Sequence, residues 1–200
     1  VLPDKLYNMT ALQYVAFSYN QFSGSIPLLF GSTSMELEAI FLNDNMLSGT
    51  IPFSLYNNSF LDTLYLKNNL LNGMIPNDLC GIATNLSFVS FDYNYFSGSI
   101  SNSLYTTCTQ LAYLSVIDNI LIGNITNAFY DLTSLYQVAF SDNYITGTLS
   151  SSLSQLTGLI VVRLEYNYFS GSIPINSFSL FHDLQSLFIQ GNSFTGDITQ

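Results

Sequence analysis

Apolar residues recur along the whole chain with one long period. Aligned leucines stand 24 or 25 residues apart, at Leu12, Leu37, Leu61, Leu86, Leu111, Leu135, Leu159 and Leu184. If each leucine is position 1 of a unit, positions 4 and 6 are apolar in all units, as at Val15 and Phe17. This alternation predicts a short strand in each unit, with the side chains of positions 4 and 6 in a stacked core. The sequence therefore predicts a repeat protein.

Two further positions of the unit are invariant. Position 9 is always asparagine: Asn20, Asn45, Asn69, Asn94, Asn119, Asn143, Asn167 and Asn192. A buried amide has donors and acceptors, so this ladder can bond the backbone of its own turn and of the neighbouring unit. Position 13 is always glycine, as at Gly24, which suits a turn with positive φ or a close approach of two units. Both positions are predicted to be structural.

The segments LQYVAFSYNQFSGSIP (12–27) and LIVVRLEYNYFSGSIP (159–174) resemble the plant-type extracellular leucine-rich-repeat family, with consensus LxxLxLxxNxFSGxIPxxL. The match covers essentially the whole chain. The resemblance implies a β-dominated solenoid of the α/β type: a curved, right-handed superhelix with a concave parallel sheet and 24 to 25 residues per coil. Serine or threonine replaces the consensus proline at Ser101, Thr126, Ser150 and Thr199, where looser convex turns are expected.

The chain is predicted to form one array. It contains a partial repeat at 1–11, seven full repeats at 12–183 and a truncated repeat at 184–200. Residues 2–11 align with 51–60, so the chain opens within a unit, and neither end has a cysteine-rich cap. Because a finite solenoid needs polar caps, we expect either a part of a longer array or copies that stack end to end into a filament.

The charge balance narrows the range of partners. The chain has 13 acidic and 3 basic residues and a net charge of -10, which argues against nucleic acid and anionic lipid. No apolar run approaches the roughly 18 residues that a membrane span needs, so no membrane insertion is expected within this segment. The family resemblance implies a secreted protein or a cell-surface protein that binds a protein, peptide or glycan.

The predicted outward positions of the strand are 3, 5, 7 and 8. Each of the first five units carries one aromatic residue at position 3 or 5: Tyr14, Phe41, Tyr65, Phe88 and Tyr113. With strands about 4.8 Å apart, these rings would form a stripe roughly 20 Å long, which predicts a ligand-binding surface. Arg163 and Phe188, at position 5 of later units, are added to it. The alternative is that aromatic residues simply suit strands.

Acids and tyrosines gather at the end of the strand. Positions 7 and 8 carry Asp44, Asp92, Asp118, Asp142 and Glu165, which we expect to be solvated, and no metal site is predicted. Tyrosines also recur at positions 8 and 10: Tyr19, Tyr93, Tyr95, Tyr144, Tyr166 and Tyr168. They could stack against sugar rings, or they could cap apolar coils with the hydroxyl in water.

Two kinds of covalent modification are compatible with the sequence. Sequons occur at Asn8, Asn57, Asn85 and Asn124, about as often as chance predicts for this composition, so their number is no evidence of secretion. Cys80 and Cys108 fall on the convex side of adjacent coils. They could form a disulfide or stay as two buried thiols, because a three-residue offset separates them in the repeat.

Signatures of catalysis are missing from the sequence. His182 is the only histidine, and there is no HExxH, no GxSxG and no phosphate-binding glycine loop. We therefore expect neither an enzyme nor a cofactor. The predicted function is an extracellular recognition or scaffold module. The alternative is a structural or adhesive protein that forms filaments or matrix by self-association.

Overall fold

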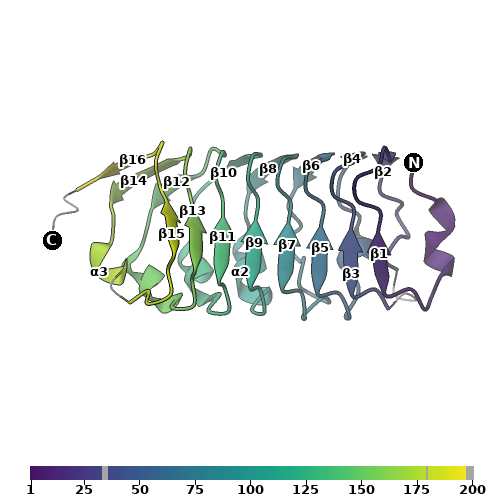
Figure 1. Ribbon diagram of the computed structural model, residues 1–200, viewed down its shortest axis with the longest axis horizontal. Helices are drawn as coiled ribbons and strands as arrows, with labels where there is room; N and C mark the ends of the chain where they lie inside the picture. Colours follow the sequence, from purple (N-terminus) through teal and green to yellow (C-terminus); the bar gives the residue numbers. More distant parts are fainter. Residues whose placement is uncertain (33–35, 179, 197–200) are drawn as a thin grey trace.

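The computed structural model describes residues 1–32, 36–178 and 180–196. They form an elongated stack of coils, and the chain runs from one end of the stack to the other (Figure 1). Each coil contributes one strand to a main parallel sheet, and the lateral strands and short helices follow it in the chain. The fold is thus the β-dominated leucine-rich-repeat solenoid that the periodicity and the resemblance predict.

The main sheet contains eight parallel strands in chain order. In its register Tyr14 pairs with Ala39, and Ala39 pairs with Thr63. The strands are β1 (Tyr14–Ala16), β3 (Ala39–Phe41), β5 (Thr63–Tyr65), β7 (Phe88–Ser90), β9 (Tyr113–Ser115), β11 (Gln137–Ala139), β13 (Val161–Arg163) and β15 (Ser186–Phe188). We number the coils 1 to 8 after these strands.

A second layer of strands lies along one side of the main sheet (Figure 1). It divides into a group of five strands and a group of three, linked by the isolated bridge between Asn124 and Thr146. The first group is β2 (Ser23–Ser25), β4 (Met46–Gly49), β6 (Leu70–Met74), β8 (Tyr95–Ser99) and β10 (Ile120–Ile122). The second is β12 (Thr146–Thr148), β14 (Tyr168–Ser172) and β16 (Ser193–Thr195).

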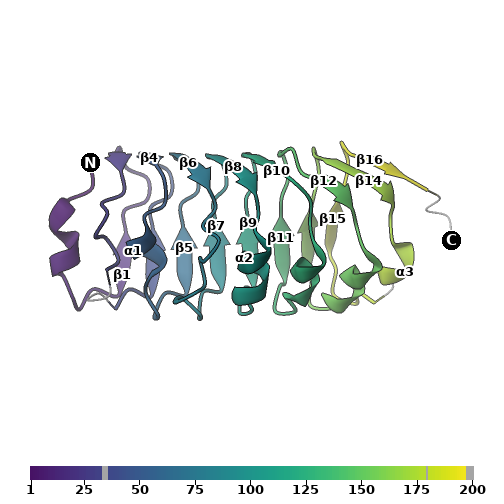
Figure 2. The same cartoon turned by 180° about the vertical axis from the view of Figure 1, so that it is seen from behind.

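Short helical turns occupy the face opposite the main sheet (Figure 2). They are η1 (Asp4–Asn8), α1 (Phe53–Tyr56), α2 (Asn102–Thr107), η2 (Asn127–Asp131), η3 (Ser151–Gln155) and α3 (Ile175–Phe178). The expectation of looser turns where serine replaces proline is wrong at two positions. The hydroxyls of Ser101 and Ser150 accept hydrogen bonds from backbone N–H groups and so cap α2 and η3. Thr199 lies outside the described residues.

The core is built by the apolar ladders and held in register by asparagine. Leu86, Val89 and Phe91 of coil 4 are fully buried. The amide of Asn94 donates to the carbonyl oxygens of Phe91 and Asp92 in its own turn and of Leu66 in the previous coil. Its oxygen accepts the N–H of Leu71 at 3.0 Å. One side chain thus satisfies buried backbone groups of two coils.

The position-13 glycines allow neighbouring coils to approach each other closely. Gly123 has φ of +87°, a conformation that favours glycine. A Cβ atom at this position would lie 2.8 Å from the Cβ of Ser99 in the previous coil. Conformation and space therefore both select glycine.

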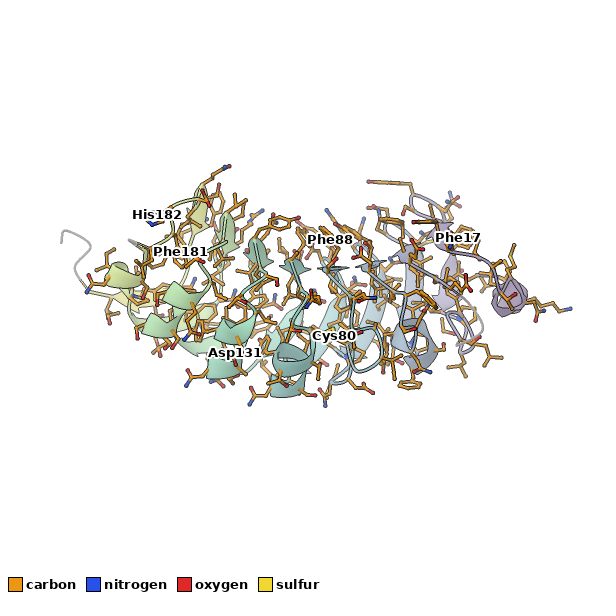
Figure 3. The ribbon with its side chains drawn as sticks, turned by 90° about the horizontal axis from the view of Figure 1, so that it is seen from below. Phe17, Cys80, Phe88, Asp131, Phe181 and His182 are labelled. Carbon is orange, nitrogen blue, oxygen red and sulfur yellow. A yellow bond between two sulfur atoms is a disulfide. The ribbon has the colours of Figure 1, made fainter. Side chains whose placement is uncertain are left out.

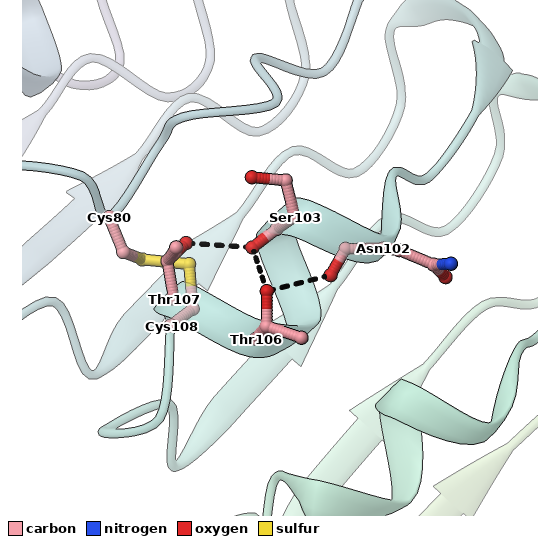
Figure 4. The surroundings of a disulfide bond; sticks show 6 residues. All are labelled: Cys80, Asn102, Ser103, Thr106, Thr107 and Cys108. Carbon is pink, nitrogen blue, oxygen red and sulfur yellow. Dashed lines mark hydrogen bonds between the residues drawn. A yellow bond between two sulfur atoms is a disulfide. The ribbon is translucent and has the colours of Figure 1, made fainter.

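Cys80 and Cys108 are joined by a disulfide, with their Cα atoms 5.0 Å apart. The helical turn of α2 brings Cys108, its C-terminal cap, next to the preceding coil (Figure 4). The three-residue offset in the repeat therefore does not separate the two cysteines. A link of this kind restricts the unfolded chain, and such bonds persist in oxidising compartments.

Candidate functional site

The concave face of the main sheet carries a connected group of aromatic rings. Phe88 lies on this face and Cys80 on the opposite side of the solenoid (Figure 3). Ring centroids are 5.5 Å apart for Phe41 and Tyr65, 6.2 Å for Tyr65 and Tyr113, and 6.3 Å for Tyr113 and Tyr136. Phe88 contacts Tyr136 at 6.4 Å. We call these five residues (Phe41, Tyr65, Phe88, Tyr113 and Tyr136) the central aromatic cluster.

The cluster covers a buried acid. Tyr65 and Tyr113 stack although β7 lies between their strands, where position 5 is the small residue Ser90. Below the rings, Asp92 is only 4% exposed. Its carboxylate accepts hydrogen bonds from the Ser115 hydroxyl at 2.5 Å, the Ile117 N–H at 2.8 Å and the Ser90 hydroxyl at 3.1 Å. The acid therefore ties β7 to the next coil.

The electrostatics of this region follow from burial. Desolvation raises the pKa of Asp92 above its ordinary value, and its three hydrogen bonds and the charge of Lys67 offset only part of the rise. Burial, followed by the charge of Asp92, raises the pKa of Tyr113 to about 12. Burial also raises the pKa of Tyr65, with a contribution from Asp92. The tyrosine hydroxyls are thus neutral at physiological pH.

The two ends of the predicted stripe lie apart from the cluster. The Tyr14 hydroxyl donates to the Glu38 carboxylate at 2.5 Å, and this bond is the first cause of the raised pKa of Tyr14. At the other end, the Arg163 guanidinium lies 5.2 Å from the Phe188 ring centroid and 2.6 Å from the Glu165 carboxylate. The hydrogen bond to Glu165 raises the pKa of Arg163. The concave face therefore presents an aromatic middle and, in coil 7, an arginine that is paired with Glu165.

The structure corrects two expectations. The stripe is predicted from positions 3 and 5 of the first five units, but Tyr136 of coil 6 joins the cluster from position 2, just before β11. The carboxylates at the end of the strand were expected to be solvated, yet Asp92 and Glu165 are buried. A side chain that strand alternation places outward can still be buried. Hydrogen bonds within the sheet can bury it, and so can rings that pack above it.

The sequons occupy different environments. Asn8, Asn85 and Asn124 are exposed, whereas Asn57 is half-buried at the C-terminal cap of α1. The amide of Asn85 donates to the Ser59 carbonyl oxygen at 3.2 Å. Whether these asparagines carry glycans stays a prediction.

The described part of the chain has neither a membrane-spanning helix nor a cluster of metal-ligating side chains. No helix there is long and apolar enough to cross a membrane. In residues 1–32, 36–178 and 180–196, no group of three or more histidine, cysteine, aspartate or glutamate side chains could hold a metal ion.

The chain is similar to known proteins in sequence and in structure. The family model named Leucine Rich Repeat matches residues 60–82. The LRR receptor-like serine/threonine-protein kinase EFR of Arabidopsis thaliana is 38% identical over 50 residues, which is 25% of this chain and 5% of that protein.

Solved structures match over the whole array. The first is the ectodomain of the Arabidopsis thaliana membrane receptor kinase GASSHO1/SCHENGEN3 in complex with Casparian strip integrity factor 2. It has a TM-score of 0.92 and 32% identity, over 98% of this chain and 23% of that chain. The second is the Arabidopsis receptor kinase HAESA in complex with a peptide hormone and a co-receptor. It has a TM-score of 0.87 and 28% identity, over 98% and 32% of the two chains. This chain thus spans about a quarter to a third of the length of these two structures.

Proposed function

Because the chain belongs to the plant-type leucine-rich-repeat family, we propose that it is an extracellular, non-catalytic recognition module that binds a peptide, or a peptide segment of a protein, on its concave face. The observation that carries the proposal is the central aromatic cluster. Its five rings contact one another on the open face of the main sheet, where half-buried aromatic residues are suitable anchors for a ligand.

Charge and similarity support a peptide as the ligand. The net charge of -10 and the buried Asp92 below the rings favour a neutral or basic partner. Two of the similar structures are the receptor kinase HAESA in complex with the peptide hormone IDA and the plant peptide hormone receptor RGFR1 in complex with RGF2. The disulfide and the similarity to receptor ectodomains support an extracellular address.

The test is selection of random dodecapeptides by phage display on the purified protein, followed by calorimetry with the selected peptides. The matched variant is Tyr65→Ser, because the next two strands carry Ser90 and Ser115 at the same position. We expect the selected peptides to lose at least about tenfold in affinity for Tyr65→Ser, since anchor residues contribute more than about 1 kcal/mol. Selection of no peptide, or equal affinity for the variant, would refute the proposal.

Light scattering at several protein concentrations separates this function from filament formation. A recognition module stays a discrete particle as the concentration rises. Growth of the particle into fibres without ligand would favour the structural or adhesive alternative, because an interface that does not close propagates.

A further inference from the structure

A row of tyrosines follows the ridge where the main sheet turns into the lateral strands. It comprises Tyr93, Tyr95, Tyr144, Tyr166 and Tyr168, and we call it the tyrosine ridge. All five side chains are exposed. The sequence repeats Tyr-Asn-Tyr in coils 4 and 7, at 93–95 and 166–168. Three strand spacings of about 4.8 Å place the two tripeptides roughly 14 Å apart.

Position 8 of the repeat unit, which carries Tyr93 and Tyr166 of the ridge, has a backbone conformation that does not suit tyrosine. Tyr93 and Tyr166 have φ of 53° and 55°, in the left-handed region. Other coils hold Asp118, Asn68 or Gly191 at this position, also with positive φ. Asparagine, aspartate and glycine adopt this conformation at least cost, whereas a bulky residue there is an outlier.

The backbone, not the side chain, imposes this conformation. The N–H of Tyr93 donates to the Ile117 carbonyl oxygen at 2.7 Å, and the N–H of Tyr166 donates to that of Gln190 at 2.9 Å. The same bond recurs at Asn68, whose N–H donates to the Asp92 carbonyl oxygen. A coil with asparagine at this position forms the same turn. The tyrosines are therefore not needed for the turn, and they lower the stability of the fold. Tyr19 bears the same cost in coil 1, so the conformation alone does not identify a site. At Tyr93 the cost coincides with a recess on the surface, and the two observations together indicate a role in binding.

The ridge also contains a recess. It has a volume of about 290 Å³, and its lining includes Asn68, Leu70, Tyr93, Tyr95 and Asp118. Tyr95 is 55% exposed and offers its ring as one wall. The Lys67 ammonium lies 5.4 Å from the centroid of the Tyr93 ring, which favours one orientation of that ring.

The second tripeptide extends the surface. The rings of Tyr144 and Tyr168 stack with centroids 6.0 Å apart, so they form one wider platform. The Tyr166 ring lies against Gly191, where a Cβ atom would lie 2.5 Å from its Cδ1. The acids Asp118 and Asp142 occupy position 8 in the two coils between the tripeptides, and both are exposed. Tyrosine rings thus lie on both sides of two neighbouring carboxylate acceptors.

We propose that the tyrosine ridge is a second binding site, separate from the concave face, and that its ligand is a neutral oligosaccharide. A sugar ring has an apolar C–H face that stacks on tyrosine and hydroxyl groups that donate to carboxylate or amide oxygens. Asp118 and Asp142 exclude acidic sugars by repulsion. A peptide would use the same aromatic rings, but Asn68 and Asp118 in the lining of the recess offer acceptors for the hydroxyl groups of a sugar ring.

The test is calorimetry of the purified protein with cellohexaose, xylohexaose, mannohexaose and chitohexaose, and with hexagalacturonic acid as the charged probe. We expect at least one neutral hexasaccharide to bind and the acidic one not to bind. In Tyr95→Leu, which copies Leu70 of coil 3, affinity should fall at least about tenfold, because a stacked ring contributes on the order of one such factor. Tyr93→Asn should show the same loss with an unchanged or higher melting temperature.

Two matched variants keep the test independent of folding and of the concave face. Tyr19 has the same positive φ in coil 1 and lies outside the recess. Tyr19→Asn should therefore leave the affinity for the sugar unchanged. Tyr65→Ser should lose the selected peptides and keep the sugar. The proposal is overturned if no neutral hexasaccharide binds at millimolar concentration, if the acidic probe binds as well as the neutral ones, or if Tyr95→Leu binds as tightly as the unmodified protein.

Discussion

The two aromatic surfaces of the solenoid differ in what each ring gives to the fold. In the central aromatic cluster, the rings contact one another and cover the buried Asp92. On the tyrosine ridge, the rings are exposed, and two of them stand at positions where the backbone disfavours tyrosine. The cluster therefore stabilises the fold and also forms a candidate binding surface. The ridge forms its candidate binding surface at a cost in stability.

The largest effect is expected from removing a cluster ring. Tyr113→Ala loses the contacts with Tyr65 and Tyr136 and opens the cover over Asp92. We expect a loss of about 2 to 3 kcal/mol in the free energy of unfolding, measured by urea denaturation. The matched ridge variant Tyr168→Ala, whose ring is 56% exposed, should lose less than about 1 kcal/mol. Equal losses would remove the distinction between the two surfaces.

A smaller effect is expected from the acid below the cluster. The pKa of Asp92 is raised in the folded protein, so its ionised form is disfavoured there. Between the unfolded value, about 3.9, and the raised folded value, the folded state binds more protons, so stability falls as pH rises. Asp92→Asn has no charge. Its amide oxygen can keep the hydrogen bonds from Ser115 and Ile117, and its NH2 group can donate to the Ser90 hydroxyl, which reverses the third bond. We expect the variant to be more stable at pH 7.

The pH dependence of this difference is the decisive readout. Thermal denaturation of both proteins between pH 7 and pH 3 should show the advantage of Asp92→Asn shrinking as the pH falls. An advantage that stays constant across this range would mean that the carboxyl group of Asp92 does not titrate differently in the folded and unfolded states.

The next substitution is expected to raise stability, and it tests whether tyrosine at a position with positive φ is unfavourable. Tyr19 is 80% exposed and has φ of 56° in coil 1. Tyr19→Asn should raise the free energy of unfolding by about 0.5 to 1 kcal/mol, because asparagine adopts this conformation at lower cost. Chemical denaturation checks the gain. The reverse variant Asn68→Tyr should lose more than this amount, because it also removes the hydrogen bond from the Asn68 amide to the Asp44 carboxylate. A loss of stability in Tyr19→Asn would show that the exposed ring packs favourably.

The repeat pattern predicts the fold because each invariant residue contacts only its own coil or the adjacent coil. The leucines, the asparagine ladder and the glycines act within a coil or on the adjacent coil, so their spacing alone specifies the stack. The contact between Tyr65 and Tyr113 skips a strand and depends on the small Ser90 between them, which no single position of the repeat reveals. Tyr136 reaches the cluster from outside its strand.

Burial of the acids has a similar explanation. Strand alternation describes which side a residue points to, but not what covers it. Asp92 is outward by position but buried. Its carboxylate bonds to the hydroxyls of Ser90 in its own coil and Ser115 in the next coil, and it interacts electrostatically with the half-buried Tyr65 and Tyr113 of the cluster. The recurrence of tyrosine at positions 8 and 10 is evident in the sequence, whereas the positive φ of Tyr93 and Tyr166 depends on backbone hydrogen bonds between coils.

The smallest effect is expected at Tyr14, where the sequence pattern and the structure differ. The stripe of aromatic residues predicts that Tyr14 belongs to the binding surface. In the described residues its hydroxyl bonds to Glu38, and no ring of the cluster contacts it. Tyr14→Ala should therefore leave both the denaturation midpoint and the affinity for selected peptides unchanged, measured by urea denaturation and calorimetry. A loss of peptide affinity close to that of Tyr65→Ser would extend the binding surface to coil 1, and the ligand would then lie across the whole stripe.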